Sequence, residues 1–439
     1  MRLIFTLVLL VIGAPRISAQ EISPVLFGQN HWMAQGDENR PGYLHLLWPK
    51  VQESGIELIR IGGNSYERNM PSRERLSAMV ASIQSIGAEP LVQVPSQYSA
   101  EQAYDLVRFF SASNKRPIKY WSIGNEPLFF KSSIGQVHAY LKRIALAMKS
   151  ADPTIKILVF DECEFRDAAY EELCTGRLDL TGQDENGRWI IDGFTFHRYP
   201  NGEQFDRRNV VFSGVEDINS SCQRLVKLLE RADRMHGRTG DARLLWGLTE
   251  VNVTYANPDR DVAGIGNPSF LGGQFIAEVF GIGMKLGALT VAPWCINETD
   301  KVSTDFGYIG TPPEFHPRSS YYHVQMLSRN FRGRYLATTS NREYVKSIGS
   351  VDPERICVMI LNEDETRSFD FDLVLTADAR SDKALVVAAD LGLQERTSGT
   401  IPSQTTMLLV LDSKGRRIRQ YTYGLRQNER NLPPVVETF

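Results

Sequence analysis

The chain has 439 residues, of which 42% are hydrophobic and 23% charged, and its formal net charge is −3. This composition is that of a globular protein and excludes a disordered or fibrous one, while the near-neutral charge gives no general attraction for nucleic acids or anionic membranes. The length exceeds the size at which a single core stops growing, so we expect one large and one smaller domain.

The first 19 residues have the features of a signal peptide. Arg2 provides a positive start, Leu3–Ile12 form an apolar stretch, and Ile17-Ser18-Ala19 fits a cleavage site. A buried N-terminal strand or a membrane anchor is the alternative, but the apolar run is shorter than the roughly 20 residues that a spanning helix needs. We therefore expect a secreted or periplasmic protein that begins near Gln20.

The cysteines do not indicate a metal centre. None has the CxxC or Cys/His spacing that is typical of zinc sites, so we predict no metal and no other cofactor. An odd number in an exported protein permits at most two disulfides, and Cys163 and Cys174 are the nearest pair, but burial as small apolar side chains explains them equally well. We predict no particular disulfide among Cys163, Cys174, Cys222, Cys295 and Cys357.

From Ser23 to about Ile296, short apolar runs alternate with longer amphipathic segments, as in βα units around a parallel sheet. A doubly wound sheet is the weaker alternative, because Phe27–Trp32 carries no GxGxxG turn. Eight strands predict a (β/α)8 barrel. The strand-like runs are Val25–Asn30, Leu58–Gly62, Pro90–Val94, Tyr120–Glu126, Ile155–Asp161, Gly193–His197, Leu244–Glu250 and Leu289–Trp294, and the crossover helices include Ser72–Ile86, Ala100–Ser111, Gly135–Ser150 and Ser221–Met235.

After a further helical segment, Ser319–Asn330, the pattern changes to short alternating strands separated by polar turns. Irregular loops are the alternative to a small β-sandwich here. We place the barrel in residues 20–330, the sandwich in 331–425 and a tail in 426–439, for which we prefer a frayed terminus to a basic binding arm. The runs that fit the sandwich are Arg342–Ile348, Arg355–Leu361, Ser368–Leu375, Ala384–Ala388 and Thr405–Leu411.

Two glutamates end apolar strands of the predicted barrel. Glu126 lies in Gly124-Asn125-Glu126-Pro127 after the fourth run, and Glu250 ends the seventh. Active sites of such barrels lie at the C-terminal ends of the strands, where a buried carboxylate is costly unless it is paired or used. Either glutamate alone fits a rim residue or a structural ion pair as well as it fits catalysis. Their joint occurrence favours catalysis.

Gly124-Asn125-Glu126-Pro127 and Thr249-Glu250 resemble the acid/base and nucleophile signatures of glycoside hydrolase clan A, a group of retaining (β/α)8 enzymes. The resemblance covers roughly Ser23–Asn297. It implies cleavage of O-glycosidic bonds in a poly- or oligosaccharide by double displacement, with Glu126 as general acid/base and Glu250 as nucleophile. An ionised Glu250 would disfavour a second negative charge nearby, so we expect Glu126 to be neutral near the working pH.

The same resemblance suggests five substrate-binding residues. Arg60 would hold the nucleophile ionised, and Asn125 would bind the sugar 2-hydroxyl. His197 and Tyr199 end the sixth strand, where the clan commonly places a contact to the nucleophile, and Trp294 would stack on the sugar ring. The structural alternatives are an ordinary barrel ion pair, a turn asparagine, satisfied buried side chains and a core tryptophan.

The substrate is a carbohydrate whose identity stays open. Arg60-Ile61-Gly62-Gly63-Asn64-Ser65 is similar to a segment of the heparanase and β-glucuronidase family, while the general layout also suits the β-xylosidase, arabinofuranosidase and β-glucosylceramidase families. A non-catalytic carbohydrate-binding barrel is the alternative function. A metal-dependent hydrolase would need an HxH pair near the first strand, where only His31 lies, and a structural or adhesive protein would work through the sandwich.

Overall fold

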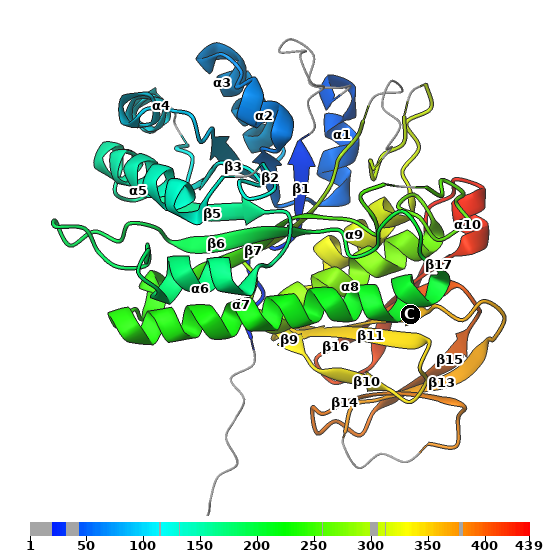
Figure 1. Ribbon diagram of the computed structural model, residues 1–439. Helices are drawn as coiled ribbons and strands as arrows, with labels where there is room; N and C mark the ends of the chain where they lie inside the picture. The colour runs from blue at the N-terminus through cyan, green and yellow to red at the C-terminus, as the bar shows by residue number, and fades with distance from the viewer. Residues whose placement is uncertain are drawn as a thin grey trace, which may run out of the picture.

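The computed structural model describes residues 20–31, 44–113, 116–130, 132–256, 258–298, 306–311, 313–376 and 381–439. The predicted signal peptide, residues 1–19, lies outside them. Eight parallel strands form one sheet in chain order, and a bridge between Phe27 and Val291 joins its first and last strands into a barrel (Figure 1). The strands are β1 (Gly28–His31), β2 (Leu58–Ile61), β3 (Glu89–Val94), β4 (Tyr120–Ile123), β5 (Lys156–Glu162), β6 (Gly193–Arg198), β7 (Leu245–Val251) and β8 (Thr290–Pro293).

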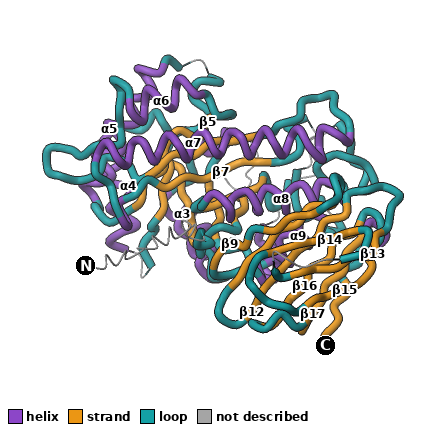
Figure 2. The backbone as a smooth tube through the Cα atoms, turned by 90° about the horizontal axis from the view of Figure 1, so that it is seen from below, coloured by secondary structure: helices purple, strands orange, loops and turns teal. Residues whose placement is uncertain are grey.

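Helices connect the strands and cover the outside of the barrel (Figures 1 and 2). They are α1 (Leu44–Ser54), α2 (Asn64–Arg68), α3 (Arg73–Ser85), α4 (Ala100–Ser113), α5 (Ile134–Ala151), α6 (Asp167–Thr175), α7 (Gly214–His236) and α8 (Phe270–Leu286), with a π-helical turn at Asn209–Ser213 and a 3-10 turn at Gly240–Ala242. The predicted (β/α)8 barrel is confirmed, and no helix in the described ranges is long and apolar enough to cross a membrane.

The interior of the barrel changes from apolar to polar along the strands. Side chains two residues apart face the same side of a strand, so the apolar Leu58 is followed inside by Arg60, Leu91 by Gln93, and Tyr120 by Ser122. An apolar layer therefore closes the N-terminal end of the barrel, and it consists of Val25, Leu58, Leu91, Tyr120, Leu158 and Leu289. The polar layer above it is the floor of the site described below.

The C-terminal part is a β-sandwich of a four-stranded and a six-stranded sheet, ordered β10-β14-β13-β15 and β18-β17-β16-β12-β11-β9. The predicted sandwich is confirmed, but five of its strands were not predicted. Those five are β9 (Arg334–Leu336), β10 (Thr338–Ser340), β15 (Arg396–Ile401), β17 (Arg417–Gly424) and β18 (Val435–Thr438); the predicted ones are β11 (Val345–Val351), β12 (Arg355–Asn362), β13 (Phe369–Val374), β14 (Leu385–Ala389) and β16 (Thr405–Asp412).

The C-terminal tail is ordered, so the prediction of a frayed terminus is wrong. After the short helix α10 (Leu425–Glu429), strand β18 pairs antiparallel with β17, with Arg419 opposite Thr438. All four residues of β18 are exposed. The strand is held by backbone hydrogen bonds at the sheet edge, and such an edge strand needs no apolar alternation in its sequence.

Two helices join the barrel to the sandwich. The nearly fully buried α8 and α9 (Ser319–Asn330) lie between the barrel and the six-stranded sheet (Figure 2). A Cβ at Gly281 of α8 would lie 3.2 Å from Ile348 of β11, and His323 Nε2 lies 2.7 Å from the Thr406 hydroxyl of β16. This junction therefore tolerates little change in volume.

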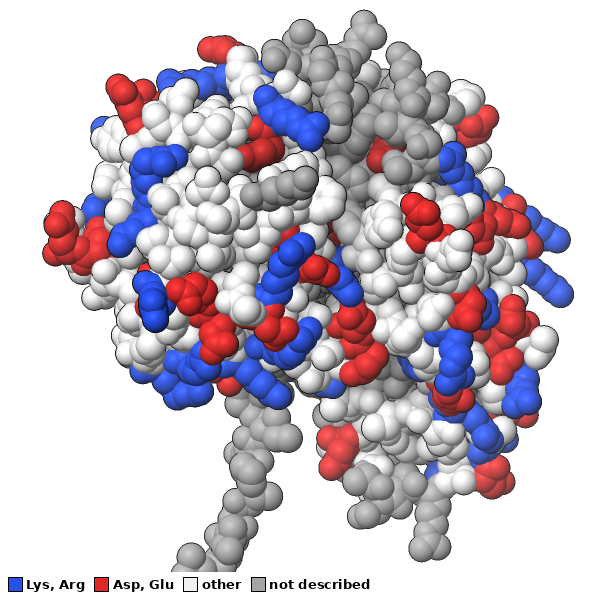
Figure 3. Space-filling model, in the orientation of Figure 1, with Lys and Arg blue, Asp and Glu red and all other residues white. Residues whose placement is uncertain are grey.

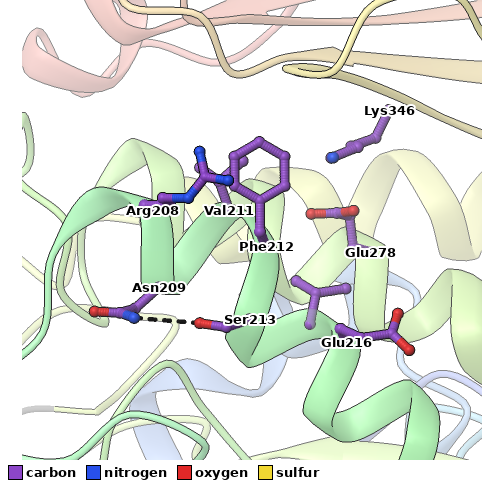
Figure 4. A pocket seen from close by; sticks show the side chains of 9 residues that line it. Arg208, Asn209, Val211, Phe212, Ser213, Glu216, Glu278 and Lys346 are labelled. Carbon is purple, nitrogen blue, oxygen red and sulfur yellow. Dashed lines mark hydrogen bonds between the residues drawn. The ribbon is translucent and has the colours of Figure 1, made fainter.

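A cavity of about 480 Å³ lies at the same junction, remote from the barrel floor (Figure 4). The Phe212 ring lies in this cavity. The Arg208 guanidinium is 5.0 Å from the ring centroid, and the Lys346 ammonium is 4.3 Å from it. Elsewhere on the surface, basic and acidic side chains are interspersed over the face shown in Figure 3. All five cysteines are free.

Candidate active site

The two predicted carboxylates meet at the C-terminal end of the barrel. Glu250 lies on β7, and Glu126 follows the end of β4 in a turn where Gly124 has φ 73° and Glu126 has φ 46°. The Glu126 N–H donates to the carbonyl of Asp161, 2.7 Å away on β5, which fixes this turn. One carboxylate oxygen of each glutamate and one ring nitrogen of His197 lie within 4.8 Å of one another.

Glu250 is held at both oxygens. Arg60 Nη1 donates to its Oε1 over 2.8 Å, and the Tyr199 hydroxyl donates to its Oε2 over 3.0 Å. Arg60 is fully buried; burial alone would lower its pKa, but the charges of Asp161 and Glu250 raise it. The guanidinium is therefore permanently charged and donates directly to the Glu250 carboxylate.

His197 contacts Glu126 more closely than Glu250. Its Nδ1 lies 2.9 Å from Glu126 Oε1 and 3.7 Å from Glu250 Oε2. Burial alone would lower the pKa of His197, but the negative charge of Glu250 and the hydrogen bond to Glu126 raise it. Of the two residues at the end of β6, Tyr199 contacts Glu250, and His197 contacts Glu126 more closely.

This contact corrects the expectation that Glu126 is neutral at rest. Burial raises the pKa of Glu126, but the hydrogen bond and charge of His197 outweigh burial and hold that pKa below its ordinary value. A proton placed on Glu126 with neutral His197, or on His197 with ionised Glu126, gives the same net charge. These shifts favour the proton on His197 at rest, and the sequence argument failed because it considered only Glu250 as the neighbour of Glu126.

The sequence analysis missed Asp161, the residue that links the two halves of the site. Its Oδ2 accepts from Arg60 Nη2 over 3.1 Å, its Oδ1 accepts from the hydroxyls of Thr249 and Thr195, and His197 Nε2 lies 3.9 Å from Oδ1. Burial raises the pKa of Asp161, but Arg60 and His197 lower it below its usual value. Its position at the end of the fifth predicted strand was the available signal.

Asn125 and Trp294 lie close to Arg60 and Glu250, and their contact with a sugar stays a prediction. Asn125 Oδ1 accepts from Arg60 Nη2 over 2.7 Å, and its Nδ2 donates to Asn64 over 2.9 Å. The Trp294 ring lies 2.8 Å from the point that a Cβ of Gly63 would occupy, and Glu250 Oε1 lies 3.5 Å from that point. The indole therefore sits beside the carboxylate with Gly63 beneath it, and Gly63 has φ 96°.

Asn30 also belongs to the site and was not predicted. Its amide donates to the carbonyls of Thr249 and Ala292, each 2.8 Å away, and its Oδ1 accepts from Arg60 over 3.0 Å. This side chain ties β1 to β7 and β8 directly under the carboxylates. Asn30 is the last residue of the first predicted strand, and this position could have identified it as a site residue.

Glu126, His197 and Glu250 could each give one ligand atom to a metal ion. A cation at that point would face the guanidinium of Arg60, which already occupies Oε1 of Glu250 at 2.8 Å. The like charges would repel one another. The arrangement of two carboxylates, one imidazole and one fixed positive charge is better suited to proton transfer and to nucleophilic attack.

No protein-family model matches the sequence, and no curated protein matches it. Solved structures do match. An α-L-arabinofuranosidase from Thermotoga maritima in complex with arabinose has a TM-score of 0.64 at 12% identity, over 90% of this chain and 97% of that chain. A family 51 arabinofuranosidase from Xanthomonas axonopodis pv. citri has a TM-score of 0.64 at 11% identity, over 89% and 96%.

A monomeric β-xylosidase from Caulobacter crescentus has a TM-score of 0.60 at 12% identity, over 89% of this chain and 97% of that chain. At such low identities these likenesses establish only the fold. The likeness includes the sandwich as well as the barrel, because it covers 89% or more of this chain. They confirm, at the level of the fold, the resemblance to clan A that the two motifs suggested. The finer resemblance to the heparanase and β-glucuronidase family stays a prediction.

Proposed function

We propose that this protein is a retaining glycoside hydrolase that cleaves O-glycosidic bonds, with Glu250 as nucleophile and Glu126 as general acid/base. The observation that carries the proposal is the approach of the two carboxylates, which have one oxygen each within 4.8 Å of the other. Retaining pairs hold their carboxyl groups about 5 to 5.5 Å apart, whereas inverting pairs leave roughly 6.5 to 9.5 Å for a water.

The two glutamates have different tasks because their surroundings differ. Arg60 and the Tyr199 hydroxyl each bond to one oxygen of Glu250 and orient it, so Glu250 can attack the anomeric carbon while the bond to the leaving group breaks. Glu126 is paired with the imidazole of His197 and can donate a proton to the departing oxygen. In the second step Glu126 takes a proton from water, which attacks the anomeric carbon and releases Glu250.

His197 supplies the proton reservoir for these two steps. When sugar binding removes water from the site, the ion pair of Glu126 and His197 loses solvation of two charges, and the proton moves to Glu126. After Glu126 has protonated the leaving group, neutral His197 and ionised Glu126 remain. The carboxylate is then ready to act as base. Both proton positions rely on the 2.9 Å contact between Nδ1 and Oε1.

The test is hydrolysis of a panel of aryl glycosides, beginning with α-L-arabinofuranosides and β-D-xylosides because similar folds carry those activities. We expect turnover by the wild type and its near loss in Glu126→Gln and Glu250→Gln. Proton NMR should show that the first-formed product keeps the anomeric configuration of the substrate. Saccharide binding without turnover would favour the carbohydrate-binding barrel, and activity abolished by a chelator would favour a metal-dependent hydrolase.

We also propose that the protein is exported. The support is the sequence of residues 1–19, with a positive start, an apolar stretch and a small-residue cleavage site. Export would bring the site into contact with polysaccharide outside the cytoplasm. N-terminal sequencing of protein recovered from its native host should start near Gln20, whereas a retained Met1 would refute cleavage.

A further inference from the structure

A small cavity lies directly beside Glu126. Its volume is about 200 Å³, and Asn125 and Pro127, the two neighbours of Glu126 in the chain, both line it. Pockets that hold drug-sized ligands have volumes of about 300 to 1,000 Å³, so this one has room for a single ring. Because Glu126 protonates the oxygen of the leaving group in the proposed reaction, a group attached to that oxygen emerges next to the cavity.

An exposed aromatic pair follows Pro127 in the chain, and its second member, Phe130, lines the cavity. Phe129 and Phe130 expose 59% and 44% of their surface, and their ring centroids lie 5.2 Å apart. The N–H of Phe130 donates to the carbonyl of Glu126 over 3.2 Å, so this ring and the acid share one turn. Both phenylalanines leave apolar surface in contact with water, which is unfavourable. Two such side chains beside a site provide a surface for the apolar face of a sugar ring.

The wall of the cavity holds a hydroxyl without a partner. The Tyr140 hydroxyl is buried and forms no hydrogen bond with any described group. It lies 3.0 Å from the point that a Cβ of Gly124 would occupy, so only glycine leaves room for it beside the acid/base turn. An unpaired buried hydroxyl destabilises the folded state. A hydroxyl of a bound ligand would remove that cost.

The acidic group of the cavity is not available to a ligand. Glu67 Oε2 accepts from Gln93 Nε2, and its Oε1 accepts from the backbone N–H and the hydroxyl of Ser96. These bonds turn the carboxylate toward the loop after β3. Tyr140 and the Phe130 ring are thus among the groups that a neutral sugar would meet, together with Arg68, whose guanidinium lies 5.6 Å from the Phe130 centroid.

We propose that this cavity binds the first sugar of the leaving group, with Phe130 stacked on the ring and the Tyr140 hydroxyl hydrogen-bonded to one of its hydroxyls. The proposal rests on the proposed function. It makes Tyr140 and Phe130 specificity-determining residues that act on a glycosyl leaving group and have nothing to contact when the leaving group is a single atom. Fluoride is such a leaving group.

The test compares a disaccharide with the glycosyl fluoride of the same cleaved sugar. In Tyr140→Phe and Phe130→Ala, the ratio of kcat/KM for the disaccharide to kcat/KM for the fluoride should fall about ten-fold, equivalent to the loss of one good contact of about 1.4 kcal/mol. Tyr104→Phe, a change at an exposed tyrosine of α4 that does not line the cavity, is the matched control and should leave the ratio unchanged.

A ratio that is unchanged in both cavity variants would overturn the proposal. The melting temperature of Tyr140→Phe should equal or exceed that of the wild type, because the unpaired hydroxyl is lost; a clear decrease would show that the hydroxyl has a structural partner. If the wild type cleaves no glycoside, the proposed function fails by itself. In that case the affinity of the disaccharide, measured by calorimetry, tests whether the cavity binds a sugar. Equal affinity of the wild type and Tyr140→Phe would overturn the proposal.

Discussion

We predict that stability falls between about pH 5 and pH 9 because a carboxyl pair at the barrel–sandwich junction loses its proton. Glu278 of α8 and Glu363, which follows β12, interact electrostatically at this junction, where two buried negative charges would repel one another. Glu363 is fully buried, and Figure 4 shows Glu278 near Lys346. Burial raises the pKa of Glu278 from 4.5 to about 7, although Lys346 opposes this, and burial with the charge of Glu278 raises that of Glu363.

The direction and size of this pH effect follow from the linkage between proton binding and folding. A group whose pKa is raised on folding contributes its full stability below the unfolded pKa, here 4.5, and loses it as the pH rises through the folded pKa, here about 7. At roughly 1.4 kcal/mol per pKa unit, Glu278 therefore contributes at most about 3 kcal/mol that is absent at alkaline pH. A glutamine at this position keeps the size of the side chain but cannot lose a proton in this pH range.

The assay is urea denaturation, followed by tryptophan fluorescence, at about pH 5 and about pH 9. The free energy of unfolding of the wild type should fall by up to about 3 kcal/mol more than that of Glu278→Gln. Glu230→Gln, at an exposed position of α7, is the control and should follow the wild type. Equal pH dependence of wild type and Glu278→Gln would refute the raised pKa of Glu278.

Three further predictions concern the site. In His197→Gln the alkaline limb of the pH profile of kcat/KM should move to lower pH, because Glu126 no longer shares its proton with a second base; an unmoved limb would contradict the pairing. In Gly63→Ala the positive φ and the close approach to Trp294 should raise KM and lower the melting temperature, whereas wild-type values would show that the ring is free to shift. Tyr170→Phe should cost about 1 to 3 kcal/mol in denaturation experiments, because its hydroxyl lies within 2.9 Å of two strand carbonyls; no loss would show that water replaces it.

The sequence carried enough information for the barrel because each strand is an apolar run with a polar end. Every predicted run overlaps an observed strand, and the rule that located Glu126 and Glu250 also applied to Asn30 and Asp161, where we did not use it. The edge strand β18 has no apolar face, so its pairing depends on the neighbouring backbone and leaves no pattern in the sequence.

The partner of Glu126 could not be predicted from the sequence. Glu126 lies beyond β4 in a turn with positive φ, and the register of β6 against β7 shifts between Phe196 and His197. These two irregularities decide which carboxylate the imidazole meets. Strand periodicity predicts that His197 faces the barrel interior, but not that it meets Glu126.

The most direct test of the central claim is azide rescue of the two alanine variants on an activated aryl glycoside. In Glu126→Ala the leaving group needs little protonation, so the covalent intermediate should accumulate, and azide, which needs no base, should restore turnover with a glycosyl azide of retained configuration. In Glu250→Ala no covalent intermediate forms, and azide in the vacated space should give the inverted glycosyl azide. The reverse pattern would exchange the two roles, and no rescue in either variant would contradict the pairing of Glu126 with Glu250.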